Sequence, residues 1–534
     1  MQVEAGYLVR VAAERYPERT ALVEVERGIS LSFSSLNQRA NRLGSGLLAL
    51  GLRRGDRVGV VGYNCMELLE SWFGLEKHGL VRAVLHSHFP MSMHARCLQP
   101  IGARGLIFTA DFAEVVESHL DQIPDVECLV CVGPRKKTPR FAHHYEDVIA
   151  AGTDAEPRLQ VDENDACTVQ FTSGTTGLPK PWVKTYRCWL TLIQQHLYIN
   201  DRISREPVNR DDVNLHLGAI QHGTGVNTLY PYIFHGCKSV LVGDRTFDPE
   251  KVLSVMNLHQ VTGVLIPAPK LREIMARLAA PGTKCPGLKR LIVPTGGPDS
   301  VDAVRRLWGD CISRGYGSTE TGTVTHLLMD DYLDGLAAGK HRRCTSSIGR
   351  PMTPLVEVRI VGTDLEPVPT NEVGEIVVRS AMSDGYYWKR PDLMKAAFLP
   401  GNWFRTGDLG YRDSDGYFYY IDRKSDCIAT AQGLVYPHIV ENAIAKHPAV
   451  ERVAAIGVPG SQAESVKACV RLKEGHGPEA TVRDELLLLC RRELLANEVP
   501  SSIDFVVDLP LVAGGLKVRR SEVRRRQLER DNRE

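Results

Sequence analysis

Short runs of apolar and β-branched residues alternate with segments of helical periodicity along the first third of the chain. Strands joined by helices pair in parallel, because each helix returns the chain to the same edge of the sheet. We therefore expect an α/β core built on parallel sheets. The strand-like runs and the helical segments that follow them are 57–61 with 66–74, 81–85 with 91–98, and 105–108 with 113–120.

The pattern changes after about two thirds of the chain, where strand-like runs follow one another closely without helical segments between them. Runs at 411–412 and 417–421 flank Asp413-Ser-Asp-Gly416, a turn sequence typical of antiparallel hairpins. Together with runs at 356–361 and 375–379, this stretch predicts a small antiparallel β subdomain.

A third pattern begins after the charged segment 422–426, and the chain of 534 residues exceeds the size at which one hydrophobic core keeps growing. We therefore predict two domains. Residues 1–422 form a large N-terminal domain of parallel α/β subdomains plus the antiparallel subdomain, and residues 423–534 form a small mobile α+β C-terminal domain. In the latter, helical segments at 437–447 and 481–497 alternate with strand-like runs at 454–458, 468–472 and 503–507.

Charge and cysteine content exclude several kinds of partner. The 65 basic and 64 acidic side chains give a net charge of +1, which leaves no electrostatic footprint for nucleic acid or an anionic membrane surface. The N-terminus lacks the apolar stretch of a secretory signal, and no apolar run reaches the length of a membrane span. Thirteen cysteines, an odd number, fit free thiols in a reducing compartment. We expect a cytoplasmic protein that acts on a small molecule.

One segment carries most of the chemical information. Thr172-Ser-Gly-Thr-Thr-Gly177 packs four hydroxyls and two glycines into six residues, and Lys180 follows. Glycines let backbone amides turn inward, hydroxyls donate to anionic oxygens, and the lysine supplies a point charge, so the segment is suited to a polyphosphate. It is not a Walker loop, because Pro179 and Pro181 flank the lysine instead of a helix start.

This loop resembles the phosphate-binding signature of the adenylate-forming superfamily, which includes acyl-CoA synthetases, aryl-acid ligases, firefly luciferase and peptide-synthetase adenylation domains. The resemblance covers about residues 8–520 and is closest in type to an acyl-CoA synthetase; Pro181 stands where the family usually has glycine. Gly315-Tyr-Gly-Ser-Thr-Glu-Thr-Gly322 matches a second signature. It implies that Tyr316 lies against adenine, Thr319 touches the α-phosphate, and Glu320 holds the Mg²⁺ that accompanies ATP.

Further signatures follow in the family's order. Thr295-Gly-Gly-Pro298 resembles the backbone beside the adenine ring, Trp403–Gly410 resembles the ribose-binding signature with Asp408 as acceptor, and Arg423 resembles the arginine that opens the C-terminal domain. By this resemblance, the residues that bind ATP are Thr172, Ser173, Gly174, Thr175, Thr176, Lys180, Gly296, Gly297, Pro298, Tyr316, Gly317, Asp408 and Arg423.

The C-terminal signature of the family contains a catalytic lysine. Here its usual Gly-Lys step reads Gly515-Leu-Lys517, so Lys517 is offset by one residue, and Arg519 is the one close substitute. The acid is already ionised at neutral pH, so adenylation requires positioning and charge neutralisation but no general base. We predict Lys517, Thr319, Glu320 and His222 as the catalytic residues.

The same resemblance implies that the acid pocket is built around His222, the strand before Gly296 and the 315–322 loop. His222 either shapes this pocket or is an ordinary core histidine. No Asp or Glu lies between 214 and 234, which predicts a substrate without an α-ammonium group. Small side chains predict room for a bulky aryl or polycyclic acid; they are Gly218, Gly223, Gly225, Gly315 and Gly317.

Two departures concern the second half-reaction, transfer of the acyl group to CoA. Ser425 stands where the hinge usually has Asp or Lys, and Gln432 stands where glycine usually lies beside the incoming thiol. These changes predict an impaired thioester step, with a carrier protein or an amine as the alternative acceptor. A luciferase-like oxygenase is a second alternative. A silent binding protein is disfavoured, because the phosphate-site residues Lys180, Thr319 and Glu320 are retained.

Overall fold

The computed structural model describes residues 1–87, 89–172, 179–220, 223–243, 245–278, 287–294, 301–460, 463–475, 479–511 and 518–531. These residues divide into two compact units. Unit 1 contains residues 1–172, 179–358 and 378–404, and unit 2 contains the described residues of 359–377 and those from 405 onward. The domain boundary predicted from the sequence, at residues 422 and 423, stays a prediction.

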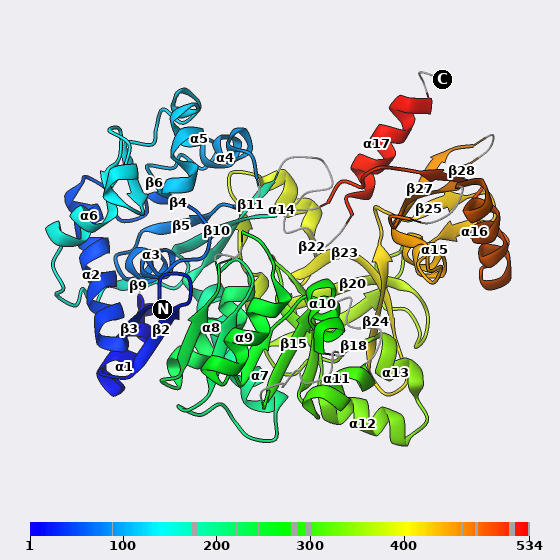
Figure 1. Cartoon of the computed structure of the whole chain (residues 1–534), viewed down its shortest axis with the longest axis horizontal. Coiled ribbons are helices and arrows are strands. Elements are labelled where there is room, and N and C mark those ends of the chain that lie inside the picture. The colour runs from blue at the N-terminus through cyan, green and yellow to red at the C-terminus, as the bar shows by residue number, and fades with distance from the viewer. Residues whose placement is uncertain are drawn as a thin grey trace. The chain divides into compact units, whose positions relative to one another are not determined.

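The described part of unit 1 contains an eight-stranded sheet, here called sheet 1, whose central strands are parallel (Figure 1). At one edge, β11 and β21 pair antiparallel with their neighbours. The central strands coincide with the runs predicted from the sequence, which confirms the α/β core. In spatial order the strands are β21 (Tyr386–Tyr387), β11 (Lys180–Thr185), β10 (Ala166–Thr172), β5 (Val81–Val84), β4 (Arg57–Val61), β6 (Gly105–Thr109), β7 (Cys128–Val132) and β8 (His143–His144).

Both faces of sheet 1 are buried, because successive side chains of a strand enter different hydrophobic clusters. In β6, Leu106 and Phe108 pack in one cluster with Leu98, whereas Ile107 packs in another with Leu43. A parallel strand covered on both sides needs apolar side chains at every position. This requirement explains why the runs in the sequence are continuously apolar and do not alternate.

A second eight-stranded sheet, sheet 2, lies in the described part of unit 1 and is also parallel at its centre. Its two edges are antiparallel hairpins, one of which carries the 315–322 signature. In spatial order the strands are β17 (Gly322–Leu327), β16 (Ile312–Ser318), β15 (Arg290–Pro294), β14 (Gly263–Leu265), β12 (Val213–His216), β13 (Lys238–Leu241), β2 (Thr20–Glu24) and β3 (Ile29–Ser32). Two short strands, β1 (Gln2–Glu4) and β9 (Gln160–Asp162), pair separately.

Helices connect these strands, and side-chain caps define where several of them begin. The Ser32 side chain accepts a hydrogen bond from the backbone of Ser35, and the Thr185 side chain accepts one from Cys188. The helices of unit 1 are α1 (Tyr7–Arg15), α2 (Phe33–Ala49), α3 (Met66–Lys77), α4 (Met91–Leu98), α5 (Ala113–Glu117), α6 (Tyr145–Ala151), α7 (Tyr186–Ile203), α8 (Gly223–Phe234), α9 (Pro249–His259), α10 (Ala268–Leu278), α11 (Val301–Trp308), α12 (Met329–Ala337), α13 (His341–Ser346) and α14 (Pro391–Ala397).

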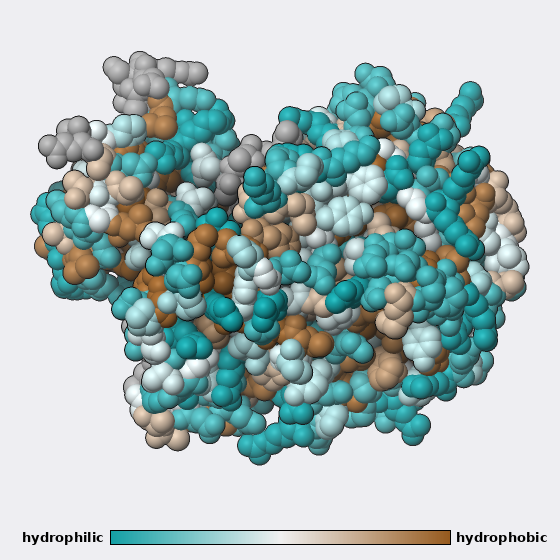
Figure 2. All heavy atoms as spheres, turned by 180° about the vertical axis from the view of Figure 1, so that it is seen from behind, coloured by the Kyte–Doolittle hydropathy of each residue, from teal (hydrophilic) through white to brown (hydrophobic). Residues whose placement is uncertain are grey.

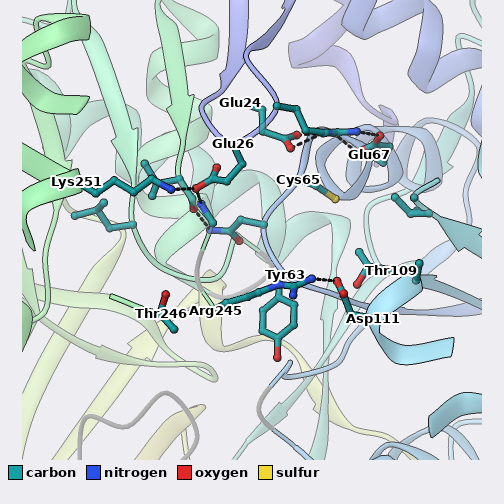
Figure 3. A pocket seen from close by; sticks show the side chains of 18 of the residues that line it. Glu24, Glu26, Tyr63, Cys65, Glu67, Thr109, Asp111, Arg245, Thr246 and Lys251 are labelled. Carbon is teal, nitrogen blue, oxygen red and sulfur yellow. Dashed lines mark hydrogen bonds and ion pairs between the residues drawn. The ribbon is translucent and has the colours of Figure 1, made fainter. Parts of the chain in front are cut away.

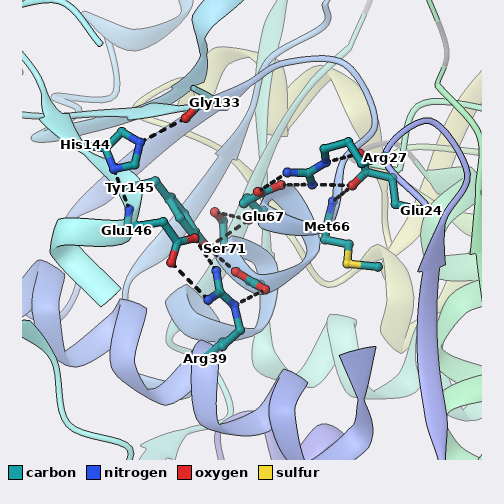
Figure 4. A network of polar contacts seen from close by, with 11 residues as sticks. Glu24, Arg27, Arg39, Met66, Glu67, Ser71, Gly133, His144, Tyr145 and Glu146 are labelled. Atoms are coloured by element: carbon teal, nitrogen blue, oxygen red, sulfur yellow. Dashed lines mark hydrogen bonds and ion pairs between the residues drawn. The ribbon is translucent and has the colours of Figure 1, made fainter. Parts of the chain in front are cut away.

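A chain of ion pairs ties three of the N-terminal helices together (Figure 4). Arg39 of α2 lies 2.6 Å from a carboxylate oxygen of Glu70 in α3 and 2.6 Å from one of Glu146 in α6. The Tyr145 hydroxyl also donates to Glu70, at 2.9 Å. Burial raises the pKa of Glu70, although the hydrogen bond and charge of Arg39 act in the opposite direction. Arg27 forms a similar bridge between two other glutamates, as the dashed lines in Figure 4 show.

The antiparallel region predicted from the sequence is present. Strands β23 and β24 form the hairpin around Asp413–Gly416, with Arg412 opposite Phe418. In spatial order, β24 (Phe418–Arg423), β23 (Trp403–Arg412), β20 (Gly374–Ser380) and β19 (Val356–Val361) are neighbours, and β22 (Phe398–Leu399) pairs with β23. The short strand β18 (Ser347–Gly349) follows α13.

The C-terminal part of unit 2 is a small α+β arrangement, as the sequence predicts. Its strands β27 and β28 are antiparallel, and β29 pairs parallel with β28. One hydrophobic cluster joins these strands to both neighbouring helices through residues such as Ile444, Val470 and Leu486. The elements are β25 (Ile428–Thr430), β26 (Gly433–Val435), α15 (Pro437–Ile444), β27 (Val450–Pro459), β28 (Glu464–Leu472), α16 (Glu479–Glu493), β29 (Ser502–Phe505) and α17 (Arg520–Asp531).

The face shown in Figure 2 is largely hydrophilic, with hydrophobic side chains in separate groups among charged and polar ones. Among the described residues, no helix is both long and apolar enough to cross a membrane.

Candidate active site

The phosphate-binding signature lies in sheet 1, between two paired strands. Thr172 ends β10 and Lys180 begins β11, and the two residues are direct partners in the antiparallel ladder. The ladder therefore holds both ends of the 173–178 segment close together. A short connection across a strand pair, rich in glycine and hydroxyl groups, is suited to surround an anion with donors.

The second signature forms the tip of the hairpin between β16 and β17, where Ser318 pairs with Gly322. Two reciprocal hydrogen bonds close this turn: the Ser318 amide donates to the Thr321 hydroxyl at 3.0 Å, and the Thr321 amide donates to the Ser318 hydroxyl at 3.3 Å. Gly322 has a φ of 64°, and a Cβ there would lie 2.8 Å from Leu192. Glycine is therefore required at the end of the turn that presents Thr319 and Glu320.

Tyr387, which the sequence analysis did not identify, contacts the proposed metal ligand. Its hydroxyl donates to Oε1 of Glu320 at 3.1 Å, and its ring makes an edge contact with Trp182 of β11 at 4.8 Å between ring centroids. Burial, followed by the negative charge of Glu320, raises the pKa of Tyr387 well above its ordinary value, so it stays a donor. Tyr387 lies 67 residues away in sequence from Glu320, and no sequence spacing could predict the contact.

A second residue that the sequence analysis missed is Lys184 of β11. Its side chain is buried, and its ammonium group donates to the backbone carbonyl of Thr319. Burial lowers the pKa of Lys184, while the charge of Glu320 opposes this shift. One feature of the sequence could have identified Lys184. It follows the apolar residues Trp182 and Val183, and it lies four residues from Lys180, so the two lysines share one face of a strand.

Behind the hairpin lies a layer of buried polar side chains from α7 and β17. Gln195 donates to the carbonyl of Thr323 at 2.8 Å, and the Thr323 hydroxyl lies 3.3 Å from Nε2 of His196. Burial lowers the pKa of His196 to about 3 and that of His326 to about 4. Both rings are therefore neutral at physiological pH, and this layer adds no positive charge to the site. Tyr316, paired with Thr325 in the hairpin, is also buried.

In unit 2, two residues predicted to bind the nucleotide lie together. Asp408 of β23 is directly opposite Arg423 of β24, and Nε of Arg423 lies 3.3 Å from Oδ1 of Asp408. The side chain of Asp408 is 8% exposed and that of Arg423 is 46% exposed. Thr406 fixes the backbone of β23 beside them, because its hydroxyl accepts from the Asp408 amide at 3.0 Å and donates to the carbonyl of Ile376.

A hub of charged groups surrounds the segment after Arg423. Arg520, at the start of α17, lies 3.2 Å from Asp422 and 3.0 Å from Asp426, and it forms two hydrogen bonds with Glu441 of α15. Burial works against the ionised form of Asp422, but a hydrogen bond from His438 and the charge of Arg520 keep its pKa below the ordinary value. This hub anchors the chain just after the C-terminal signature to the segment 422–426.

Gln432, one of the two departures that concern the thioester step, lies in the hairpin of β25 and β26. Thr430 pairs with Gly433, so Ala431 and Gln432 form a two-residue turn whose side chains are exposed. Gly433 has a φ of 125°, which a residue with a side chain rarely adopts. Ser425 donates to the carboxylate of its neighbour Asp426 at 3.2 Å.

Several predicted site residues lie outside the described residues, and their roles stay predictions. They are Ser173, Gly174, Thr175, Thr176, His222, Gly296, Gly297, Pro298 and Lys517.

The glycine argument for a roomy acid pocket is wrong at three of its five positions. A Cβ at Gly225 would lie 1.9 Å from the carbonyl of Ile220, and one at Gly317 would lie 1.9 Å from the carbonyl of Gly322. At Gly315 a Cβ would lie 3.0 Å from the His326 ring. Gly225 and Gly317 permit close approach to neighbouring backbone, and Gly315 lies against a side chain, so these glycines carry no information on substrate size.

A separate cavity of about 750 Å³ opens at the carboxyl ends of strands from both sheets of unit 1 (Figure 3). Some of its charged side chains form ion pairs, such as Arg245 with Asp111, and Lys251 with Glu26 at 2.6 Å. The described residues that line it include equal numbers of acidic and basic groups and none of those predicted to bind ATP or the acid.

The donor set at the 315–322 hairpin fits a magnesium ion that arrives with a nucleotide. Glu320 offers one carboxylate, and the described residues contain no group of three or more His, Cys, Asp or Glu side chains that could hold a metal. Mg²⁺ in nucleotide enzymes is held by one or two carboxylates, the phosphates and water, and not by a cage of protein ligands. Glu320 supplies one such carboxylate, and Tyr387 links it to β11, the strand that begins at Lys180.

Comparison with known proteins agrees with the fold and the signatures. The model of the AMP-binding enzyme family matches residues 9–387, and that of the AMP-binding enzyme C-terminal domain matches residues 439–516. A feruloyl-CoA synthase from Amycolatopsis sp is 30% identical over 512 residues, which cover 93% of this chain and 94% of the relative. A 2-succinylbenzoate–CoA ligase from Bacillus cereus (strain Q1) is 28% identical, over 94% of this chain and 95% of the relative.

The crystal structure of an anthranilate CoA ligase in complex with anthranoyl-AMP has the same fold, with a TM-score of 0.84 and 24% sequence identity over 98% of this chain and 97% of that one. The chain belongs to the AMP-binding enzyme family. The prediction of an adenylate-forming ligase of the acyl-CoA synthetase type is thereby confirmed.

Proposed function

We propose that this chain is an ATP- and Mg²⁺-dependent ligase that joins an aryl carboxylic acid to CoA through an acyl-adenylate. The observation that carries the proposal is the hairpin tip with Thr319 and Glu320, which lies in a chain with the complete order of adenylation signatures. The ladder pair Thr172 and Lys180, which closes the phosphate-binding segment, supports the same reading.

In the first half-reaction, a carboxylate oxygen of the acid forms a bond to the α-phosphorus of ATP, and the bond from that phosphorus to the bridging oxygen breaks. Pyrophosphate leaves with the electron pair. Lys180 and the hydroxyls that follow Thr172 hold the phosphates, and Thr319 contacts the α-phosphate. Glu320 would hold magnesium, which neutralises phosphate charge when it is bound. Because the acid is already ionised, these residues position the reactants and stabilise charge, and they transfer no proton.

Two further groups orient the nucleoside. Asp408 accepts hydrogen bonds from the ribose hydroxyls, and Tyr316 lies beside the adenine. The carboxylate of Asp408 is largely buried and is paired with Arg423. In the second half-reaction the thiol of CoA attacks the acyl carbonyl, the carbon–oxygen bond to AMP breaks, and AMP leaves.

The names of two of the relatives support an aryl acid as substrate, whereas other relatives are named for long-chain fatty acids and medium-chain acyl groups. Feruloyl-CoA synthase and 2-succinylbenzoate–CoA ligase are both named for acids that contain an aromatic ring. The absence of Asp and Glu between 214 and 234 disfavours an amino acid, whose ammonium group would need a buried carboxylate partner.

Acyl-CoA formation from a panel of acids tests this function. We would incubate the protein with ATP, Mg²⁺ and CoA, add cinnamic, benzoic, fatty or amino acids in turn, and detect products by mass spectrometry. The proposal predicts aryl-CoA and AMP in equal amounts. Conversion of fatty acids alone would overturn the aryl assignment, and aryl-AMP without aryl-CoA would overturn the second half-reaction.

A further inference from the structure

The buried Lys184 has no carboxylate partner among the described residues, although buried charges are normally paired. Its ammonium group donates to an uncharged acceptor, the backbone carbonyl of Thr319. Lys77 in α3 shows the ordinary arrangement. It is fully buried and lies 2.8 Å from a carboxylate oxygen of Glu156. The two lysines differ in whether a carboxylate forms a direct ion pair with the ammonium group.

The position of Lys184 on β11 directs it toward the phosphate site. Alternate residues of a strand share a face, so Lys184 lies on the same face as Lys180 and Trp182. The intervening Val183 packs instead in a hydrophobic cluster of sheet 1. Trp182 is paired in register with Tyr387, whose hydroxyl donates to Glu320. This face of β11 is therefore the one that meets the Thr319–Glu320 turn.

We propose that Lys184 is a positioning residue for the polyphosphate of ATP. It donates to the Thr319 carbonyl and adds a positive charge that forms no direct ion pair with a carboxylate of the described residues. Because the interior screens charge less than water does, such an ammonium group attracts the triphosphate without touching it. The proposal rests on the proposed function, since it assumes that this turn faces ATP.

Binding of ATP, measured by calorimetry with and without Mg²⁺, separates charge from structure. Metal-free ATP carries about twice the negative charge of its magnesium complex, so the loss of a fixed positive charge should weaken metal-free ATP more. For Lys184→Met we expect about a tenfold weaker affinity for metal-free ATP and about a threefold weaker affinity for MgATP. Lys184→Gln keeps a donor for the Thr319 carbonyl but no charge. Its affinity for metal-free ATP should also fall more than its affinity for MgATP, and this variant serves as the test if Lys184→Met folds poorly.

The matched control is Lys77→Met, which also removes a buried lysine and should leave both ATP affinities within about twofold of wild type. Equal loss of both affinities in the Lys184 variants would show a merely structural role and overturn the proposal. Unchanged ATP affinities in both Lys184 variants would also overturn the role of Lys184. The proposed function would still stand in that case, provided that the wild type binds ATP. A wild type that binds no ATP would contradict the proposed function itself.

Discussion

The hydroxyl of Tyr387 donates a 3.1 Å hydrogen bond to Glu320, the carboxylate to which we assign magnesium. For Glu320→Gln, which keeps the shape and removes the charge, we expect slower adenylation and a higher Mg²⁺ concentration for half-maximal rate. Tyr387→Phe removes only the donor and should change the same quantities in the same direction but less. A Glu320→Gln variant with the magnesium dependence of the wild type would remove this residue from the metal site.

Lys517 is the residue to which we assign charge stabilisation in the first half-reaction. Loss of one such donor typically slows a reaction by about two to three powers of ten, so Lys517→Ala should reduce pyrophosphate exchange by this factor with little change in ATP affinity. Exchange rates of Lys517→Ala and Arg519→Ala, measured side by side, decide the assignment. Full activity in the first variant and none in the second would show that Arg519 holds the role.

Buried histidines should make the protein sensitive to mild acid. Burial lowers the pKa of His216 and of His326 to about 4, whereas an unfolded chain protonates these rings near pH 6.5. As the pH falls from 6.5 toward 4, the unfolded state binds protons that the folded state cannot, so the free energy of unfolding decreases. Between pH 7.5 and 5 we expect a loss of about 2 kcal/mol for each ring.

Urea unfolding of His216→Gln at these two pH values measures the effect. The difference in the free energy of unfolding between wild type and His216→Gln should be about 2 kcal/mol smaller at pH 5 than at pH 7.5, because the variant lacks the buried His216 ring. The exposed His143 provides the control, and His143→Gln should follow the wild type at both pH values. A gap for His216→Gln that is the same at pH 7.5 and pH 5 would contradict the account.

Gln432 is predicted to slow the thioester step. The glutamine side chain would crowd the path of the incoming thiol. Overpacking typically costs about 1–3 kcal/mol, which would slow thioester formation by roughly one to two powers of ten. Single-turnover experiments that compare adenylate formation with acyl-CoA formation should show acyl-adenylate that accumulates in the wild type and is consumed faster in Gln432→Gly. Rapid transfer in the wild type would indicate that Gly433, with its φ of 125°, already provides the space.

The fold was predictable because burial and turn chemistry act locally on the sequence. Continuous apolar runs at β4 and β6 follow from a sheet covered on both faces, and the Asp413–Gly416 turn marks the hairpin of β23 and β24. Contacts between distant segments were not predictable in this way. Tyr387 and Lys184 meet the Glu320 turn only because β21, β11 and the β16–β17 hairpin come together in space.

The error on pocket size has a related cause. A glycine in the sequence is compatible either with free volume or with close backbone packing, and only the neighbouring atoms distinguish the two. At Gly225 the carbonyl of Ile220 occupies the space that a side chain would need. Sequence reasoning predicts the residue types of the site and their order, but it could not determine which of them have empty space beside them.

The central claim is that this chain activates a carboxylic acid as its adenylate. Exchange of radiolabelled pyrophosphate into ATP, measured with and without each acid of an aryl panel, tests it most directly, because exchange requires reversible adenylate formation and no acyl acceptor. The account predicts exchange that depends on an aryl acid and on Mg²⁺ and that is slower in Glu320→Gln. Exchange that proceeds equally without any acid, or none with every acid tested, would contradict it.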